Sequence, residues 1–250
     1  MERVNLLWTG GWDSTFRLLQ LSEERKEICV YYFIDNGRKS RDIEMERMKE
    51  ILLMIKKLPK YIAKISDINY IQVDEVMQTM KNKEISDIYL KLKQKYKLGS
   101  QYEWFALYCN YKNIYLEIGT EYSSHNKMLK ILNLEQVNLE KIKNDFLEER
   151  YIAKNEESLF YNFGKYFIFA ITNYSKKDME KISKEKDWIE IMGKTWFCHN
   201  PINKQPCGYC NPCKDAMNLE MEWRMPLSSK LRYYLINRLI IIKNKLNRGR

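Results

Sequence analysis

The sequence lacks the features expected of a membrane or secreted protein. No run of eighteen apolar residues occurs among its 250 residues, and the closest candidate, residues 235–242, is short and interrupted by Arg238. An apolar segment begins at Val4, with no signal-peptide layout before it. We therefore expect a cytoplasmic protein that does not engage a membrane.

Two common nucleotide-binding motifs are also missing. There is no G-x-x-x-x-G-K-S/T, which argues against a kinase-like P-loop that holds intact β- and γ-phosphates. There is no G-x-G-x-x-G either, which argues against binding of a dinucleotide. If the chain binds a nucleotide, it must do so through a different turn.

The composition is that of a globular protein with an excess of positive charge. Apolar residues make up 45% and aromatic residues 13%, and the length suits one domain with an appendage. The net charge of +10 is compatible with RNA or DNA as a partner. Charges of both signs alternate along most of the chain, so we expect them mainly to solvate helix surfaces and do not favour a nucleic acid.

The chain alternates between strand-like and helix-like segments. Strands are predicted at residues 4–8, 28–34, 70–73 and 114–118, and helices at 14–21, 43–58 and 102–110. This alternation favours an α/β fold with a Rossmann-like, doubly wound parallel sheet. Residues 128–157 are expected to be helical, residues 161–171 to return to the core, and Ser175 to cap a helix that runs to about residue 186. The expected units are a nucleotide-binding domain (1–187), a cysteine-rich element (188–225) and a basic tail (226–250).

A glycine-containing turn follows the first predicted strand. Glycines allow tight turns and close approach of a ligand, and free N–H groups at a helix start can bind phosphate oxygens together with nearby hydroxyls. The alternative is an ordinary strand-to-helix turn capped by Ser14 or Asp13. The candidate nucleotide-binding residues in and beyond this turn are Trp8, Thr9, Gly10, Gly11, Asp13, Ser14, Thr15, Phe33, Gly99 and Gly119.

Four of the six cysteines fall within sixteen residues, with the spacing C-x8-C-x2-C-x2-C. They are Cys198, Cys207, Cys210 and Cys213. Four thiolates can form a closed tetrahedral Zn²⁺ shell, which leaves no position for water, so the expected role is structural. An iron–sulfur cluster or unrelated free thiols are the alternatives. Cys29 and Cys109 are expected to be buried small apolar residues.

The glycine turn resembles the PP-loop signature S-G-G-x-D-S, with Thr9 in place of the first serine. Families with this signature cleave ATP between the α- and β-phosphates and hold the released pyrophosphate in the loop. The resemblance implies ATP and Mg²⁺ as cofactors, with Asp13 placing the metal or the pyrophosphate. A divalent ion there would neutralise charge that develops on the leaving group.

An ordered set of motifs extends this resemblance to the 7-cyano-7-deazaguanine synthase family. The matching segments are residues 9–14, 98–99, 117–119, 175–178, 195–198 and 206–213. The resemblance implies the fold of PP-loop (adenine nucleotide alpha hydrolase-like) proteins and a structural zinc. It also implies ATP-dependent conversion of the carboxylate of 7-carboxy-7-deazaguanine to an amide and then a nitrile, with ammonia as the amine. Asp13, Ser14 and Lys176 match the catalytic positions.

The chain departs from the family pattern at three places. Ser100 stands where the family has Arg, residues 120–126 do not align with the family's substrate loop, and the proline before the lysine helix is missing. The identity of the amine is therefore undecided. One alternative is a divergent enzyme that joins the deazaguanine to a protein acceptor, as synthase-like proteins of antiphage defence operons suggest. A PP-loop tRNA-modifying enzyme and a catalytically silent binding module are the others.

The tail from residue 226 to residue 250 contains seven basic residues and no acidic one. Apolar residues recur every three or four positions in it, which predicts a helix with an apolar stripe. The stripe consists of Leu231, Leu235, Leu239, Ile242 and Leu246. We expect it to pack on its own domain or in a homodimer, and the alternative is a docking helix for a partner.

Overall fold

The computed structural model describes residues 1–250 except 124–125, 143–149, 155–157 and 249–250. Its strands are β1 (Glu2–Leu7), β2 (Lys26–Ile34), β3 (Lys64–Ile65), β4 (Asn69–Gln72), β5 (Leu116–Ile118), β6 (Asn138–Lys141), β7 (Tyr151–Lys154) and β8 (Phe167–Phe169). Its helices are α1 (Trp12–Ser22), α2 (Arg41–Ile55), α3 (Val73–Thr79), α4 (Lys83–Tyr96), α5 (Gln101–Lys112), α6 (Lys127–Leu134), α7 (Leu159–Gly164), α8 (Lys176–Glu185), α9 (Ile189–Gly193), α10 (Asn211–Asn218) and α11 (Leu227–Arg248), with a short 3-10 helix at Glu222–Arg224.

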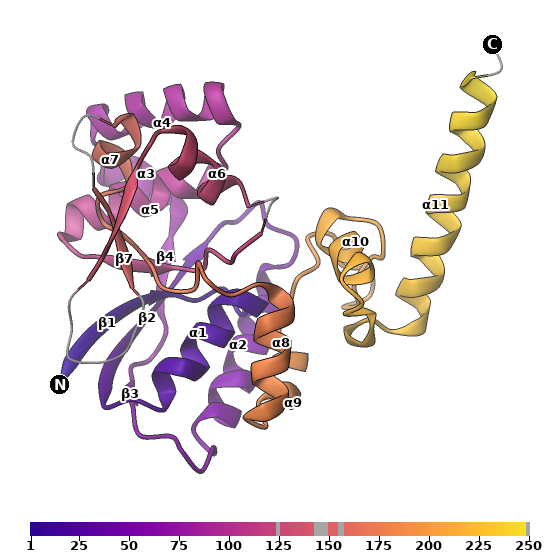
Figure 1. Ribbon diagram of the computed structural model, residues 1–250, viewed down its shortest axis with the longest axis horizontal. Coiled ribbons are helices and arrows are strands. Elements are labelled where there is room, and N and C mark those ends of the chain that lie inside the picture. The colour runs from indigo at the N-terminus through magenta and orange to yellow at the C-terminus, as the bar shows by residue number, and fades with distance from the viewer. Residues whose placement is uncertain (124–125, 143–149, 155–157, 249–250) are drawn as a thin grey trace.

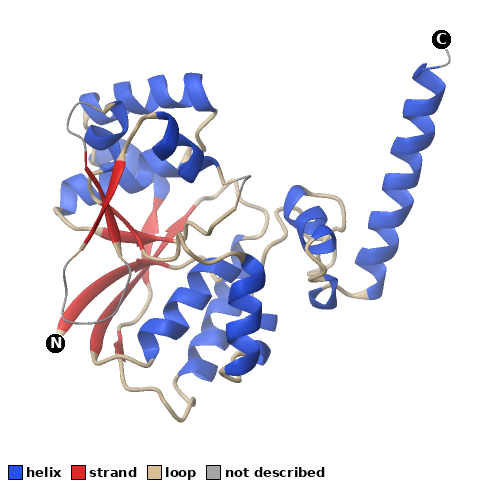
Figure 2. Ribbon diagram, in the orientation of Figure 1, coloured by secondary structure: helices blue, strands red, loops and turns tan. Residues whose placement is uncertain are grey.

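The described strands form one mostly parallel sheet in the order β3-β2-β1-β5-β8-β7-β6. Figure 2 shows the strands, in red, lying between two groups of helices. Strand β4 pairs with the same strand as β3, farther along β2, so β3 and β4 together line one edge. The pairs from β3 through β8 are parallel. Successive parallel strands require crossover helices, which explains the alternation seen in the sequence.

The sheet is parallel, as predicted, except at one edge, where β7 runs opposite to the other strands. β7 pairs antiparallel with both β8 and β6. The prediction of a helix over residues 128–157 was confirmed only for α6 and was wrong for β6 and β7. Residues 143–149 and 155–157 lie outside the described part of the chain. Helix α6 stops because the backbone turns at Gln136, whose φ is 50°. The pairing of β7 with β8, and of β6 with β7, then decides the strand conformation, which the local charge pattern does not encode.

Apolar clusters lie on both faces of the sheet. Along β2, the side chains of Cys29, Tyr31 and Phe33 enter one cluster, and those of Val30 and Tyr32 enter the other. The first cluster is shared with α3 to α7 and the second with α1, α2, α8 and α9 (Figure 1). The period of two along a strand places alternate residues on opposite faces, so a strand with helices on both faces is apolar throughout.

The C-terminal part of the chain has a smaller core. A third cluster contains three of the four clustered cysteines together with Trp196 and Met225. Helix α11 leaves this element and stands apart from the α/β body in Figure 1. Leu231, Leu235 and Leu239 are 53%, 62% and 65% exposed, so the described residues of this chain leave that part of the stripe uncovered. None of the described helices combines the length and apolar character needed to cross a bilayer.

Candidate functional site

The glycine turn connects β1 to α1 at the carboxyl end of the strand. Strand β1 has β2 on one side and β5 on the other. The strands that follow β1 are added first toward one edge of the sheet and then, from β5 onward, toward the other edge. In open α/β sheets such a switch point is where ligands bind. Gly10 has a φ of 65°, and a Cβ there would lie 2.8 Å from Cγ of Met48. Both the conformation and the close packing require glycine.

Two hydroxyls of the turn lie together. The Thr9 backbone N–H donates to Oγ of Ser14 at 3.3 Å, and the two hydroxyl oxygens are 3.4 Å apart. Ser14 Oγ also donates to the Gly11 carbonyl at 3.5 Å. Thr15 is arranged differently, because its hydroxyl accepts a 2.9 Å hydrogen bond from the buried indole of Trp8. Thr9 and Ser14 therefore face the ligand side of the turn, whereas Trp8 and Thr15 brace it from within.

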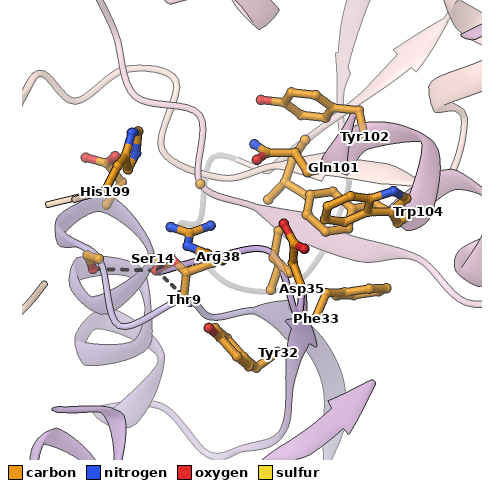
Figure 3. Close-up of a pocket in the computed structure, with 16 residues that line it drawn as sticks. Thr9, Ser14, Tyr32, Phe33, Asp35, Arg38, Gln101, Tyr102, Trp104 and His199 are labelled. Atoms are coloured by element: carbon orange, nitrogen blue, oxygen red, sulfur yellow. Dashed lines mark hydrogen bonds between the residues drawn. The ribbon is translucent and has the colours of Figure 1, made fainter. Parts of the chain in front are cut away.

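The turn opens into a pocket of about 320 Å³. Figure 3 shows Ser14 and His199 on one side of it, Tyr32 and Phe33 below, Arg38 in the middle, and Tyr102 and Trp104 on the other side. The lining residues are Leu7, Thr9, Gly11, Asp13, Ser14, Tyr32, Phe33, Asp35, Arg38, Gln101, Tyr102, Trp104, Phe105, Ile118, Gly119 and His199. Aromatic rings, a guanidinium, two carboxyls and two hydroxyls thus share a volume suited to a small ligand.

The glycines predicted outside the turn occupy different places. A Cβ on Gly119 would lie 3.4 Å from both Asp13 Cβ and the Ser14 nitrogen, so this glycine lets the end of β5 pack closely on the first turn of α1. Gly99 does not line the pocket, and a Cβ there would meet only Tyr102 and Gln101 at ordinary distances. Phe33 lines the pocket, with its ring 4.8 Å from that of Phe105.

Asp13 is the titratable group at the centre of the turn. Burial raises the pKa of its carboxyl to about 7, although Lys176 acts to lower it, and Glu121 raises it further. Its Oδ1 is buried and has no hydrogen-bond partner among the described residues. Lys176, the first residue of α8, lies 3.8 Å from Glu121. Burial lowers the pKa of Lys176, but Asp13 and Glu121 outweigh that effect and raise it overall.

Comparisons with known proteins do not identify the chain. No protein-family model matches it, and no curated protein sequence matches it significantly.

The four clustered cysteines converge as their spacing predicts. Their sulfur atoms all lie within 4.8 Å of one another. The separations are 3.8 Å for Cys207–Cys213, 3.9 Å for Cys198–Cys210 and 3.5 Å for Cys210–Cys213. A tetrahedron with Zn–S bonds of about 2.3 Å has edges of about 3.8 Å, so this set fits one metal ion such as Zn²⁺. The sulfurs are too far apart for disulfide bonds, which are about 2.05 Å long.

Backbone geometry holds these thiols in place. Gly208 has a φ of 87°, and a Cβ there would lie 2.2 Å from the Ser229 carbonyl oxygen, so only glycine fits. The Cys210 N–H donates to the Cys207 sulfur at 3.3 Å, and the Cys207 N–H donates to the Cys198 sulfur at 3.1 Å. Such N–H donors stabilise thiolates. All four sulfurs are accounted for, which leaves no open coordination position and supports a structural role.

The other two cysteines are buried, as expected. Cys29 accepts a 3.1 Å hydrogen bond from Nε of Arg3. Cys109 is fully buried, and its burial raises the pKa of the thiol. Neither lines the pocket. Neither thiol is placed to act as a nucleophile on a ligand bound there.

Several pocket residues were missed by the sequence analysis. Asp35 and Arg38 follow the carboxyl end of β2. Their position just after a predicted parallel strand could have indicated that they line a ligand pocket, because ligands bind at that end of such strands. Tyr102 begins a predicted helix but carries no motif. His199 neighbours a cysteine of the cluster and gave no sign that it lines the pocket, because only the tertiary fold brings the cysteine-rich element against the turn.

Proposed function

We propose that this chain is an ATP-dependent ligase that adenylates a carboxylate, releases pyrophosphate and transfers the acyl group to an amine. The observation that supports this most directly is the pairing of the Thr9 and Ser14 hydroxyls at the start of α1, facing a pocket of about 320 Å³. The positive end of the helix and its free N–H groups favour phosphate oxygens at this position. A carboxylate is a poor electrophile, and adenylation supplies a good leaving group.

The residues around the turn have complementary roles in this proposal. The N–H groups and hydroxyls of the turn bind the two outer phosphates, and Lys176 stabilises the negative charge that develops on pyrophosphate. The unpartnered Oδ1 of Asp13 suits a hard cation, and the residue to hold Mg²⁺ would be Asp13. When bound, Mg²⁺ would neutralise phosphate charge. Phe33 and Tyr102, on opposite walls, provide aromatic surface for the adenine.

The acid and the amine are assigned by resemblance. The motifs shared with 7-cyano-7-deazaguanine synthases make 7-carboxy-7-deazaguanine the first acid to test. Ammonia as amine would give an amide or a nitrile, and a protein amine would give a conjugate of the kind suggested by defence-associated relatives. The divergent loop at residues 120–126 would decide between them, and residues 124–125 of this loop lie outside the described part of the chain.

The test is product analysis with matched variants. The protein is incubated with ATP, Mg²⁺, 7-carboxy-7-deazaguanine and either ammonia or candidate proteins, and AMP, ADP, pyrophosphate and acyl products are measured by mass spectrometry. We expect AMP and pyrophosphate in equal amounts, and only when the acid is present. Asp13→Ala and Lys176→Met are each expected to lower the rate by about 10²-fold or more.

Lys177→Met is the matched control. Lys177 is the next residue along α8, and it pairs with Glu180 and Glu220 at the surface instead of lining the pocket. It should retain the wild-type rate. Formation of ADP in place of AMP would contradict the mechanism, and nucleotide binding without any turnover would favour a silent binding module.

The thiolating tRNA-modification alternative gains no support from the cysteines. It requires a reactive thiol near the ATP, and both Cys29 and Cys109 are buried away from the pocket lining. Attachment of an amino acid to tRNA remains a distinct alternative because it uses the same adenylation chemistry. It predicts that AMP release requires RNA, which the same assay measures with and without ribonuclease.

A further inference from the structure

A second cavity, of about 180 Å³, borders the same turn. Gly11 and Asp13 line both cavities, and the second is enclosed by Lys176 of α8 and by residues of the C-terminal element. Among the latter are Trp196 and Arg224. The cavity is smaller than a nucleotide site of about 300 Å³ or more, so its size suits a small ion or functional group. It is a junction between the α/β body and the cysteine-rich element.

Arg224 is fixed at this cavity by two aromatic rings. Its guanidinium carbon lies 4.6 Å from the ring centroid of Trp12 and 4.6 Å from that of Phe197. One terminal nitrogen donates to the Thr195 carbonyl at 3.2 Å and to the Thr195 hydroxyl at 2.6 Å. Stacking and these two bonds hold the planar group in one orientation. The guanidinium is therefore preorganised before any ligand arrives.

Two buried N–H groups beside the cavity have no acceptor. Nε of Arg224 and Nε1 of Trp12 are both buried, and neither has a hydrogen-bond partner among the described residues. Both residues line the second cavity. Buried donors in folded proteins are nearly always paired, because an unpaired one costs about 1–3 kcal/mol. Two such donors on adjacent stacked side chains indicate a missing acceptor.

The two cationic side chains that line the cavity, Lys176 and Arg224, differ in how close a carboxylate lies to them. Lys176 has a carboxylate within ion-pair distance, that of Glu121. Arg224 forms no ion pair within 4.0 Å with any described carboxylate, although Asp13 and Glu180 act on it from farther away. Burial lowers the pKa of Arg224 to about 10, so the group is still charged at neutral pH. A desolvated cation without a close counter-ion is unfavourable, and a bound anion would remove that cost.

We propose that the second cavity is an oxyanion-binding subsite in which Arg224 and the indole N–H of Trp12 donate to a phosphate or carboxylate group. Arg224 supplies charge and directed donors, which match such groups. The site stands on its own geometry, and only the source of the anion rests on the proposed function. That source is either the pyrophosphate released from ATP or a carboxylate of a substrate.

The experiment titrates the full-length, metal-loaded protein by calorimetry without ATP, using inorganic pyrophosphate in one arm and acetate in the other. Wild type is compared with Arg224→Met, which keeps an apolar chain between the rings but removes the charge and the donors. We expect Arg224→Met to weaken binding of one anion by about tenfold or more. The anion affected identifies the source. Arg224→Lys, which keeps the charge without the planar fork, should recover only part of the loss.

Two further variants make the outcome decisive. Lys177→Met should bind like wild type. If Arg224→Met loses its metal, Trp12→Phe tests the same site, since it keeps a stacked ring and removes only the N–H, and we expect a threefold to tenfold loss, on the order of one hydrogen bond.

Equal affinities of wild type, Arg224→Met and Trp12→Phe for both anions would overturn the inference. Its failure is distinct from failure of the proposed function. Anion binding that depends on Arg224 can be present in a protein that never forms AMP, and AMP formation can be normal in a protein whose second cavity binds no anion.

Discussion

The α/β body and the cysteine-rich element that follows it are stabilised in different ways. The body buries two large apolar clusters, one on each face of its sheet. The third apolar cluster, around Cys198–Cys213, has only seven buried residues; three of these are cysteines, and one, Ile43, is contributed by α2 of the body. A segment with so small an apolar core gains little free energy from burial. Burial of apolar side chains therefore stabilises the body, whereas a metal ion held by the four thiols would stabilise the element.

This difference also bears on the two cavities. The first is lined almost entirely by the body, with His199 as the contribution of the element. The second lies between the two regions, and Trp196, Phe197 and Arg224 form much of its wall. A change that unfolds the element should therefore open the second cavity completely and the first only at one side.

Loss of the metal ion should have the largest effect. Cys213→Ser, or removal of the metal by a chelator, should unfold residues 195–225, because binding of a structural Zn²⁺ contributes about 10–16 kcal/mol. Hydrogen exchange should show loss of protection there with β1 and β2 still protected. Wild type should contain one equivalent of Zn²⁺ by elemental analysis. Visible absorption from iron would contradict zinc, and loss of protection in β1 would contradict separate stabilisation.

Glu117→Gln should be the most damaging of the conservative substitutions in the body. Glu117 is 1% exposed on β5 and lies 2.8 Å from Nε of Arg17 and 2.6 Å from Nε of Arg150. Loss of its charge removes the buried carboxylate that the Arg17 and Arg150 guanidinium groups share, which costs about 3–5 kcal/mol. Urea unfolding measures the change. The matched control Glu140→Gln, in an exposed pair with Lys154, should cost less than about 1 kcal/mol. Equal costs would refute the buried network.

Asp13→Asn should make the ligand-free protein more stable than wild type, and the difference in the free energy of unfolding should grow as pH rises. The pKa of Asp13 rises from 3.8 to about 7 on folding, chiefly through burial. Between these values the folded carboxyl stays protonated while the unfolded one ionises, so each increase in pH favours unfolding of wild type. The penalty is absent below about pH 4 and complete above about pH 7. It amounts to about 4 kcal/mol at most, and to about 2 kcal/mol when the partial exposure of the side chain is considered.

Denaturation at pH 5 and pH 8 tests this sign. The stability gained by Asp13→Asn over wild type should be larger at pH 8. Asp42→Asn serves as the control, because Asp42 is fully exposed and Arg41 lowers the pKa of its carboxyl. Its effect should not grow with pH. A constant advantage of Asp13→Asn at both pH values would show that burial does not shift the ionisation of Asp13.

Substitution in the stripe of α11 should have the smallest effect on stability. Leu235 is 62% exposed, so Leu235→Ser is expected to change the free energy of unfolding by less than about 0.5 kcal/mol. Leu6→Ala, at a buried position of β1, should cost about 2–5 kcal/mol. A loss of more than about 1 kcal/mol in Leu235→Ser, together with a dimeric mass by light scattering, would show that the stripe packs in a homodimer.

Much of the fold was accessible from the sequence because its signals are local. The apolar runs at β1, β2 and β5 and the helical spacing of α2 and α5 were placed within a few residues. Ser175 caps α8 as predicted, and its hydroxyl and the Asp178 carboxylate form a reciprocal capping box. The hairpin of β6 and β7 was missed, because charged residues at those positions carry no period that separates a strand from a helix.

The glycine turn at the end of the first strand and the convergence of the four thiols could be predicted from short stretches of sequence, because both depend on residues a few positions apart. The side chains that surround the turn could not, because they come from distant segments that meet only in the folded chain. Arg224, His199 and Lys176 are distant from Asp13 in the chain; Arg224 and His199 approach it because the C-terminal element packs beside the turn, and Lys176 because α8 packs against α1. Spacing encodes short-range geometry, whereas contacts between distant segments depend on the burial of whole surfaces.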